Sequence, residues 1–197
     1  MRSKPEKYIE IESVGRSVFI RLVQPERRNP LSSEVICELE NAINSVDVLA
    51  VGQLVFTGSV DAFASGADLR EISELTADKA AAFAERGQRL MKLIEDLSIP
   101  TVAAINEACF GGGLDVALAC KKRIASPNAV FCHPGVSLGI ITGWGGTQRL
   151  PRLIGESKAL EMLLTAGRFG AEWALEAGLV DEIADDFLAA ALSTSFL

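Results

Sequence analysis

A strand, a helix and a second strand in the middle of the chain constrain the fold more than any other feature. Residues 53–57 form a short apolar run of the kind found in buried strands, and residues 101–105 form another directly after Pro100. Between them, residues 78–96 place Phe83, Leu90 and Ile94 on one helical face. Crossovers of this length join parallel strands and are right-handed. The sequence therefore predicts an α/β fold.

The remaining elements extend this pattern. Residues 8–12 and 17–23 read as a hairpin, and Ser32 or Ser33 can cap a helix that continues to about Val46. Further along, we expect a short helix at about 114–119, a strand pair near 122–131, and helices near 145–153, 156–165 and 171–177. We expect one domain over residues 1–197, with a core at about 8–183 and a short tail at 184–197.

Composition excludes several classes of protein. The chain has 197 residues, 49% of them hydrophobic, and its net charge of −7 argues against a nucleic-acid binder. No apolar run reaches the roughly 20 residues needed to cross a bilayer, and no apolar signal segment follows the N-terminus. Four dispersed cysteines and a single histidine, His133, predict neither a metal site nor a disulfide framework. We expect a cytoplasmic protein with no membrane or nucleic-acid partner.

Three segments are candidates for the functional site: residues 63–71, residues 111–115 and residues 143–151. The first two are small-residue bends that follow a strand and precede a helix. Such bends leave backbone N–H groups unpaired at the positive end of a helix dipole. Two of these bends facing each other would form a two-donor oxyanion hole, in which each donor stabilises the transition state by roughly 2.7–4 kcal/mol.

Each segment taken alone also fits a structural role. Three adjacent glycines at 111–113 are commonly a turn or packing device, and Val116 occupies the position where the dinucleotide-binding fingerprint needs its last glycine. The chain contains neither a phosphate-binding GxxxxGK[ST] motif nor the G-x-S-x-G motif of serine hydrolases. The three segments together, in this order, favour function.

In sequence order, F-x-x-G-x-D-[LI], GGG-x-[DE], F-x-x-P and G-x-GG-T-x-R-L-P resemble the enoyl-CoA hydratase/isomerase (crotonase) family. The resemblance runs from about Tyr8 to Ile183. It implies a spiral of repeated ββα units with a truncated C-terminal helical region, and a role in fatty acid metabolism. It also implies an acyl-CoA thioester substrate, no cofactor beyond the coenzyme A of that substrate, and a homotrimer or a hexamer built as a dimer of trimers.

The resemblance places the catalytic groups. The oxyanion-hole N–H groups fall on Ala67 and Gly112, and the acid/base falls on Asp115, where glutamate is usual in hydratases. The second carboxylate of those enzymes falls on Gly135, so this chain lacks it. In an extended segment, His133 would share a face with Gly135 and could enter the vacant space. A packed or surface histidine is the alternative.

The resemblance also indicates substrate-binding positions. Arg28 lies in a loop similar to the one that meets the nucleotide end of coenzyme A, with Arg27, Arg70 and Lys92 as further phosphate candidates. Trp144 could form a wall of the acyl pocket, although a large aromatic residue is often plain core. The full set of expected substrate-binding residues is Arg28, Ser65, Gly66, Asp68, Leu69, Gly111, Gly135 and Trp144.

Three functions remain open from the sequence. The first is a lyase or isomerase that stabilises a thioester enolate, for hydration, dehydration or double-bond isomerisation. The second is hydrolysis of an acyl-CoA thioester by water that Asp115 or His133 activates. The third is a pseudo-enzyme that binds acyl-CoA or a protein without chemistry, which the missing carboxylate at Gly135 favours.

Overall fold

The structure is a computed structural model that describes residues 7–59, 61–194 and 196. Its strands are β1 (Ile9–Val14), β2 (Ser17–Leu22), β3 (Pro30–Leu31), β4 (Gln53–Thr57), β5 (Ala62–Ala64), β6 (Gly66–Ala67), β7 (Thr101–Ile105), β8 (Ala108–Phe110), β9 (Lys122–Ala125), β10 (Val130–Cys132), β11 (Phe169–Gly170) and β12 (Glu182–Ile183). Its helices are α1 (Ser33–Asn44), α2 (Leu69–Ser73), α3 (Ala77–Glu95), α4 (Gly112–Ala119), α5 (Gly146–Ile154), α6 (Glu156–Thr165), α7 (Ala171–Ala177) and α8 (Phe187–Ser193). Two 3-10 turns, η1 (Pro25–Arg27) and η2 (Pro134–Leu138), complete it.

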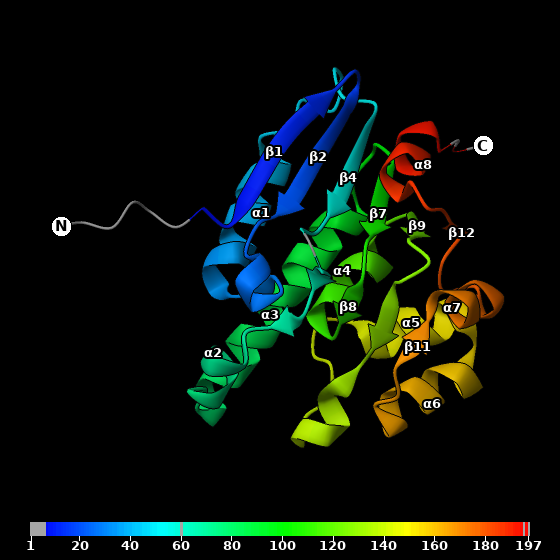
Figure 1. The fold of residues 1–197 in the computed structure, drawn as a ribbon. Helices are drawn as coiled ribbons and strands as arrows, with labels where there is room; N and C mark the ends of the chain where they lie inside the picture. Colours follow the sequence, from blue (N-terminus) through cyan, green and yellow to red (C-terminus); the bar gives the residue numbers. More distant parts are fainter. Residues whose placement is uncertain (1–6, 60, 195, 197) are drawn as a thin grey trace.

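A six-stranded sheet in the order β1-β2-β4-β7-β9-β12 forms the larger layer. Only the β1–β2 hairpin is antiparallel; every other neighbouring pair is parallel. Figure 1 shows α1, α3 and α4 behind this sheet, α8 in front of it, and α5, α6 and α7 gathered away from the β1–β2 hairpin.

The side chains of the large sheet alternate between two apolar clusters, as the pleat requires. Residues such as Ile20, Leu54 and Ile105 join the main core together with the buried faces of α1, α3 and α4. Their neighbours in the strands, such as Phe19 and Val55, pack against α8 in a second, smaller cluster. The central strands β4 and β7 are therefore covered on both faces, which is the usual condition of parallel strands.

A second sheet, in the order β11-β10-β8-β5, lies next to the first. Strands β5, β8 and β10 run parallel to one another, and each follows a strand of the large sheet after a short connection. Helices then follow each pair, which gives the units β4-β5-α3, with β6 and α2 inserted before α3, β7-β8-α4 and β9-β10-α5, with η2 inserted before α5. This repetition of ββα units confirms the predicted fold class.

Most of the expected elements are confirmed within one or two residues. The hairpin, the Ser32-capped helix and the parallel strands β4 and β7 joined through α3 all form as predicted. The strand pair expected near 122–131 is wrong as a pair. Strand β9 joins β7 and β12 in the large sheet, whereas β10 joins β8 and β11 in the small one. Among the described residues, no helix has both the length and the apolar composition needed to cross a membrane.

Candidate active site

The candidate site lies at the carboxyl ends of three parallel strands of the small sheet. Strand β5 leads to the bend that contains Ala67, β8 leads to Gly112, and β10 leads to His133. The register pairs Cys132 with Phe110, which places His133 beside Gly111. Because parallel strands end at the same edge of a sheet, segments more than sixty residues apart in sequence meet here. Ligands of open parallel sheets bind at this kind of edge.

The first bend is held by the loop that precedes β3. The carbonyl of Arg28 accepts the N–H of Ser65 (2.9 Å), and buried Asn29 donates to the carbonyl of Ala62 (2.8 Å). Gly66 takes a left-handed φ of +101°, which disfavours any other residue. Asp68 then caps α2 by accepting the N–H of Arg70 (2.9 Å). Ala67 is thus fixed between an anchored strand and a capped helix.

The second bend starts α4. Gly111 has a φ of +49°, and its N–H donates to the carbonyl of Cys132 (2.9 Å). Gly112 is the first residue of α4, so its N–H has no acceptor one turn earlier in the helix. A Cβ built on Gly112 would stand 3.3 Å from the nitrogen of Ala67, and one on Gly66 would stand 3.2 Å from the nitrogen of Gly112. The two bends therefore adjoin each other.

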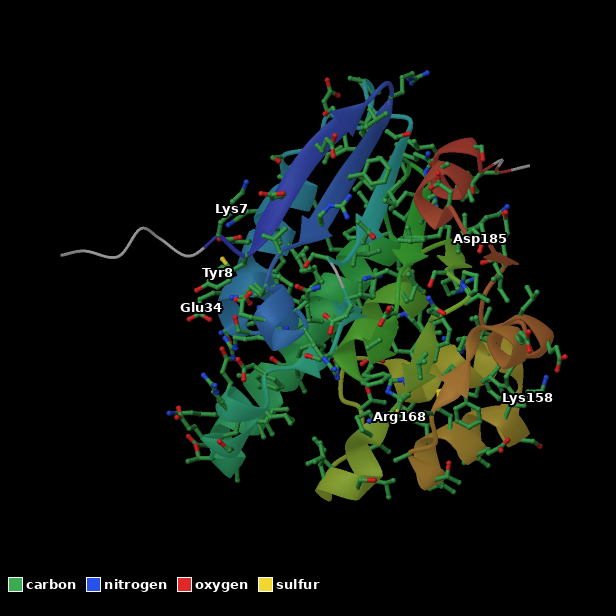
Figure 2. The ribbon with its side chains drawn as sticks, viewed as in Figure 1. Lys7, Tyr8, Glu34, Lys158, Arg168 and Asp185 are labelled. Carbon is green, nitrogen blue, oxygen red and sulfur yellow. The ribbon has the colours of Figure 1, made fainter. Side chains whose placement is uncertain are left out.

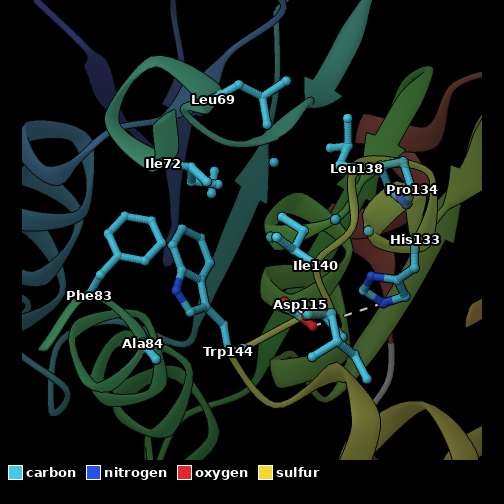
Figure 3. Close-up of a pocket in the computed structure, with 18 of the residues that line it drawn as sticks. Leu69, Ile72, Phe83, Ala84, Asp115, His133, Pro134, Leu138, Ile140 and Trp144 are labelled. Atoms are coloured by element: carbon cyan, nitrogen blue, oxygen red, sulfur yellow. Dashed lines mark hydrogen bonds and ion pairs between the residues drawn. The ribbon is translucent and has the colours of Figure 1, made fainter. Parts of the chain in front are cut away.

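These bends form one side of a cavity of about 260 Å³. Its remaining walls are mainly apolar, with Ile72, Phe83, Ile140 and Trp144 among them. Figure 3 shows Phe83 and Trp144 side by side, and their ring centroids are 5.6 Å apart. Such a cavity, apolar with a few polar groups at one place, is typical of sites for small molecules.

Two glycines provide the space for the Trp144 indole. A Cβ on Gly87 of α3 would lie 2.2 Å from indole atoms, and a Cβ on Gly112 would lie 2.4 Å from the ring. Trp144 is 3% exposed and belongs to the main core cluster. Trp144 therefore packs in the core and also lines the cavity, and its role as a wall of an acyl pocket stays a prediction.

Asp115 lies in the first turn of α4 and is 1% exposed. One carboxylate oxygen, Oδ2, accepts a hydrogen bond from the hydroxyl of Thr142 (2.6 Å), whereas Oδ1 has no hydrogen-bond partner among the described residues. Burial raises the pKa of Asp115 to about 7, against the opposing effects of the Thr142 hydroxyl, the Arg149 charge and the Gly146 N–H. A carboxyl group with this pKa can give or take a proton near neutral pH.

His133 faces Asp115 inside the cavity. Its Nε2 lies 3.9 Å from Oδ1 of Asp115, as the dashed line in Figure 3 marks, and the side chain is 2% exposed. Within the part of the chain that the structure describes, neither ring nitrogen has a hydrogen-bond partner. Burial lowers the pKa of His133 to about 4, so the imidazole is neutral at pH 7. Two titratable groups in contact, with pKa values shifted in opposite directions, suit acid and base roles.

The segment after His133 is not extended, so that premise of the sequence analysis is wrong. Residues Pro134–Leu138 form η2, and the N–H of Ile140 donates to the carbonyl of Gly135 (3.0 Å). A Cβ on Gly135 would stand 2.7 Å from the carbonyl oxygen of Ile140. The chain itself therefore occupies the place where a side chain at position 135 would start.

The structure brings most of the expected site residues to the cavity wall. Those that line it are Ser65, Gly66, Ala67, Leu69, Gly111, Gly112, Asp115, His133, Gly135 and Trp144. Asp68 and Arg28 are not among the lining residues: Asp68 caps α2 and pairs with Arg27, and Arg28 pairs with Asp61 at 3.5 Å. The Arg28 side chain is 62% exposed, so it remains a predicted contact for a nucleotide outside the cavity.

Sequence reasoning did not predict the roles of Thr142, Gly87 and Asn29 at the site. Thr142 contacts Asp115 from 27 residues away along an irregular loop, for which no periodicity exists. Gly87 is visible in the sequence as a glycine inside a helix, and such glycines often have a packing reason. Asn29 adopts a positive φ of +53°, which asparagine tolerates better than most residues.

Comparisons with known proteins agree with this geometry. A family model described as enoyl-CoA hydratase/isomerase matches residues 14–194. A crotonyl-CoA hydratase of Syntrophomonas wolfei is 39% identical over 177 residues, which are 89% of this chain and 68% of that protein. The fatty acid oxidation complex subunit alpha of Shewanella loihica is 41% identical over 175 residues, which are 86% of this chain and only 25% of that protein.

Solved structures show the same likeness. An enoyl-CoA hydratase from Bacillus anthracis superposes with a TM-score of 0.90 at 33% identity, covering 94% of this chain and 74% of that one. The family match spans nearly the whole chain, and these curated and structural similarities each cover 86% or more of it. The chain therefore belongs to the enoyl-CoA hydratase/isomerase (crotonase) family, and it is an enzyme of this lyase or isomerase type.

Proposed function

We propose that this protein adds water to the double bond of a 2-enoyl-CoA thioester, or removes water in the reverse direction. The observation that carries the proposal is the contact between Asp115 and His133, at 3.9 Å, in an apolar cavity next to the two bends. The similarity to a crotonyl-CoA hydratase supports the same reaction type.

The two bends would bind the thioester oxygen. Addition of water at C3 places negative charge on that oxygen, and the N–H groups of Ala67 and Gly112 would donate to it. Their closeness, and the position of Gly112 at the start of α4, support this role. Removing one donor from such a hole costs roughly 2.7–4 kcal/mol of transition-state stabilisation.

The two titratable groups would then divide the proton transfers. Neutral His133 takes a proton from water as the water oxygen bonds to C3, and protonated Asp115 gives its proton to C2 of the enolate. The product is a 3-hydroxyacyl thioester. His133 can return its proton to Asp115, whose Oδ1 lies 3.9 Å from Nε2, and this transfer restores the starting state. The pKa of about 7 keeps a large fraction of Asp115 protonated at neutral pH.

Double-bond isomerisation is the second candidate, and the glycine at position 135 favours it. Moving a double bond from C3 to C2 needs one group that removes a proton from C2 and returns it at C4. The carboxylate form of Asp115 can do both steps without a second acid. Because Gly135 provides no carboxylate, a one-acid reaction fits this site.

A panel of acyl-CoA thioesters distinguishes these outcomes. We expect a mass gain of 18 with a 2-enoyl-CoA, whereas unchanged mass with new ultraviolet absorption from a 3-enoyl-CoA would identify the isomerase. Release of free coenzyme A would indicate hydrolysis, and binding without turnover of any thioester would contradict the proposal.

Variants assign the roles of the two residues. Asp115→Asn should lower kcat by about a thousandfold or more with little change in ligand affinity, because general acid–base groups contribute roughly 10²–10⁴-fold. His133→Phe should suppress hydration while isomerisation, if present, survives. Asp185→Asn is the matched control, since this exposed carboxylate projects from the segment between β12 and α8 (Figure 2). Full hydration by Asp115→Asn would refute its role as the acid.

We further propose that the nucleotide end of coenzyme A lies against exposed Arg28, and that the chain assembles as a trimer or a pair of trimers. Arg28→Ala should then raise the KM for the CoA thioester but not for a short pantetheine thioester that lacks the nucleotide. Sedimentation equilibrium would measure the mass of the assembly, and a monomer would contradict the second part.

A further inference from the structure

Thr142 makes the only hydrogen bond between side chains that the structure records for Asp115 in its described residues. The hydroxyl oxygen lies 2.6 Å from Oδ2, a short distance for a bond to a carboxylate. Thr142 also lines the cavity and is half-buried. A bond to one oxygen fixes the rotation of the carboxyl group, so the other oxygen, Oδ1, takes a defined position toward His133.

The path of the loop explains how Thr142 reaches Asp115. The backbone of Ile140 crosses directly over Gly135, held by the 3.0 Å bond from its N–H to the Gly135 carbonyl. This crossing needs a residue without a Cβ, because a Cβ at position 135 would meet the Ile140 oxygen at 2.7 Å. Two residues later the chain presents Thr142 to the carboxylate. The glycine at 135 and the hydroxyl at 142 are thus parts of one arrangement.

We propose that Thr142 is a positioning residue whose hydroxyl holds Oδ2 of Asp115 and leaves Oδ1 as the atom that transfers a proton to or from the substrate. This inference rests on the proposed function of Asp115 as acid/base. It assigns a role to a residue that does not itself exchange a proton. It also explains how a shorter acid than glutamate keeps a defined geometry at this place.

The hydroxyl also affects the proton affinity of Asp115, together with a few neighbouring groups. Donation by Thr142 stabilises the carboxylate form and so lowers the pKa that burial raises. The other titratable or charged groups that face Asp115 are His133 after β10, Arg149 on α5 and Cys109 on β8. None of these groups changes in a Thr142 variant, so a shift can be attributed to the hydroxyl.

The test is the pH dependence of kcat/KM, which reports ionisations of the free enzyme. Thr142→Val keeps the shape of the side chain but removes the hydroxyl. In this pH profile, the transition caused by ionisation of Asp115 (the Asp115 limb) should lie near pH 7 in the unaltered protein. We expect this limb to move upward by about one pH unit in Thr142→Val, which is a tenfold change in proton affinity. We also expect kcat to fall about tenfold while KM changes little, because the carboxyl group loses its fixed rotation.

Two controls make the outcome decisive. Thr142→Ser retains a hydroxyl and should restore the position of the limb, and Ser137→Ala removes an exposed hydroxyl from the same loop and should change nothing. A thermal unfolding curve for each variant verifies that it is folded. If the unaltered protein is active and Asp115→Asn is inactive, but Thr142→Val keeps the original limb, the role of Thr142 is refuted and that of Asp115 stands. If Asp115→Asn is fully active, the proposed function itself fails.

Discussion

Replacing Asp115 with asparagine should make the protein more stable at pH 8 and leave its stability almost unchanged at pH 4. Burial raises the pKa of Asp115 from 3.8 to about 7. The native protein therefore binds this proton more tightly than the unfolded chain does. Below pH 3.8 both states are protonated and no penalty exists. Between pH 3.8 and about pH 7, the free-energy cost of ionising buried Asp115 in the native state grows, and it is complete above about pH 7.

The size of the expected stabilisation follows from the pKa values of Asp115 in the unfolded and native states. A pKa rise from 3.8 to about 7 corresponds to a free-energy penalty of about 4 kcal/mol at alkaline pH. Asparagine remains neutral and can still accept the Thr142 hydroxyl, so it avoids most of this penalty. Because one kcal/mol moves the melting temperature of a domain of this size by about 2–4 °C, we expect a gain on the order of 10 °C.

Thermal unfolding of both proteins at a series of pH values measures the difference. His133 acts in the opposite direction, since its lowered pKa costs stability as the pH falls from 6.5 towards 4. That cost is present in both proteins and cancels in the comparison. Asp185→Asn, at an exposed carboxylate, should show a flat difference across the series. An Asp115→Asn protein that is less stable than the unaltered chain at pH 8 would refute the reasoning.

Two further predictions concern Gly135 and Gly87, where an added Cβ would meet neighbouring atoms. Gly135→Glu restores a carboxylate at the expected position but should lower hydration activity about tenfold to a hundredfold, because its Cβ would meet the Ile140 oxygen at 2.7 Å and displace the loop; a gain in kcat/KM would contradict this. Gly87→Ala should destabilise the protein by about 1–3 kcal/mol in urea unfolding, although alanine favours a helix, because the Cβ would overlap the Trp144 ring at 2.2 Å. Gly170→Ala, where a Cβ meets nothing within 4 Å, is the control, and equal stability of the two variants would be inconsistent with the packing described.

Sequence patterns were sufficient for the features that depend on local periodicity. The apolar stripe on 78–96 and the buried run at 101–105 predict α3 and β7, and the crossover rule then predicts that β4 and β7 are parallel. The sequence patterns failed where two strands that are close in sequence belong to different sheets. Strands β9 and β10 are separated by only four residues, yet that short connection passes from the large sheet to the small one. Hydropathy alone does not distinguish such a crossing from a hairpin.

The candidate site was predictable only in part for a similar reason. The resemblance to the family indicates Ala67, Gly112 and Asp115, and the structure brings all three to one cavity. His133 also reaches that cavity, directly after β10, although the segment that follows it is a 3-10 turn and not the extended segment that the sequence analysis assumed. The contact of Thr142 with Asp115 depends on an irregular loop, whose path is set by steric space at a glycine and not by any pattern in the sequence.

The account depends on Asp115 exchanging a proton with the carbon next to a thioester whose oxygen the N–H groups of Ala67 and Gly112 bind. Incubation of the protein with saturated butyryl-CoA in D2O tests this directly, because no water is added and only the C2 hydrogens can exchange. The account predicts deuterium at C2 with the unaltered protein and with His133→Phe, and none above the uncatalysed rate with Asp115→Asn. Undiminished exchange with Asp115→Asn would contradict it.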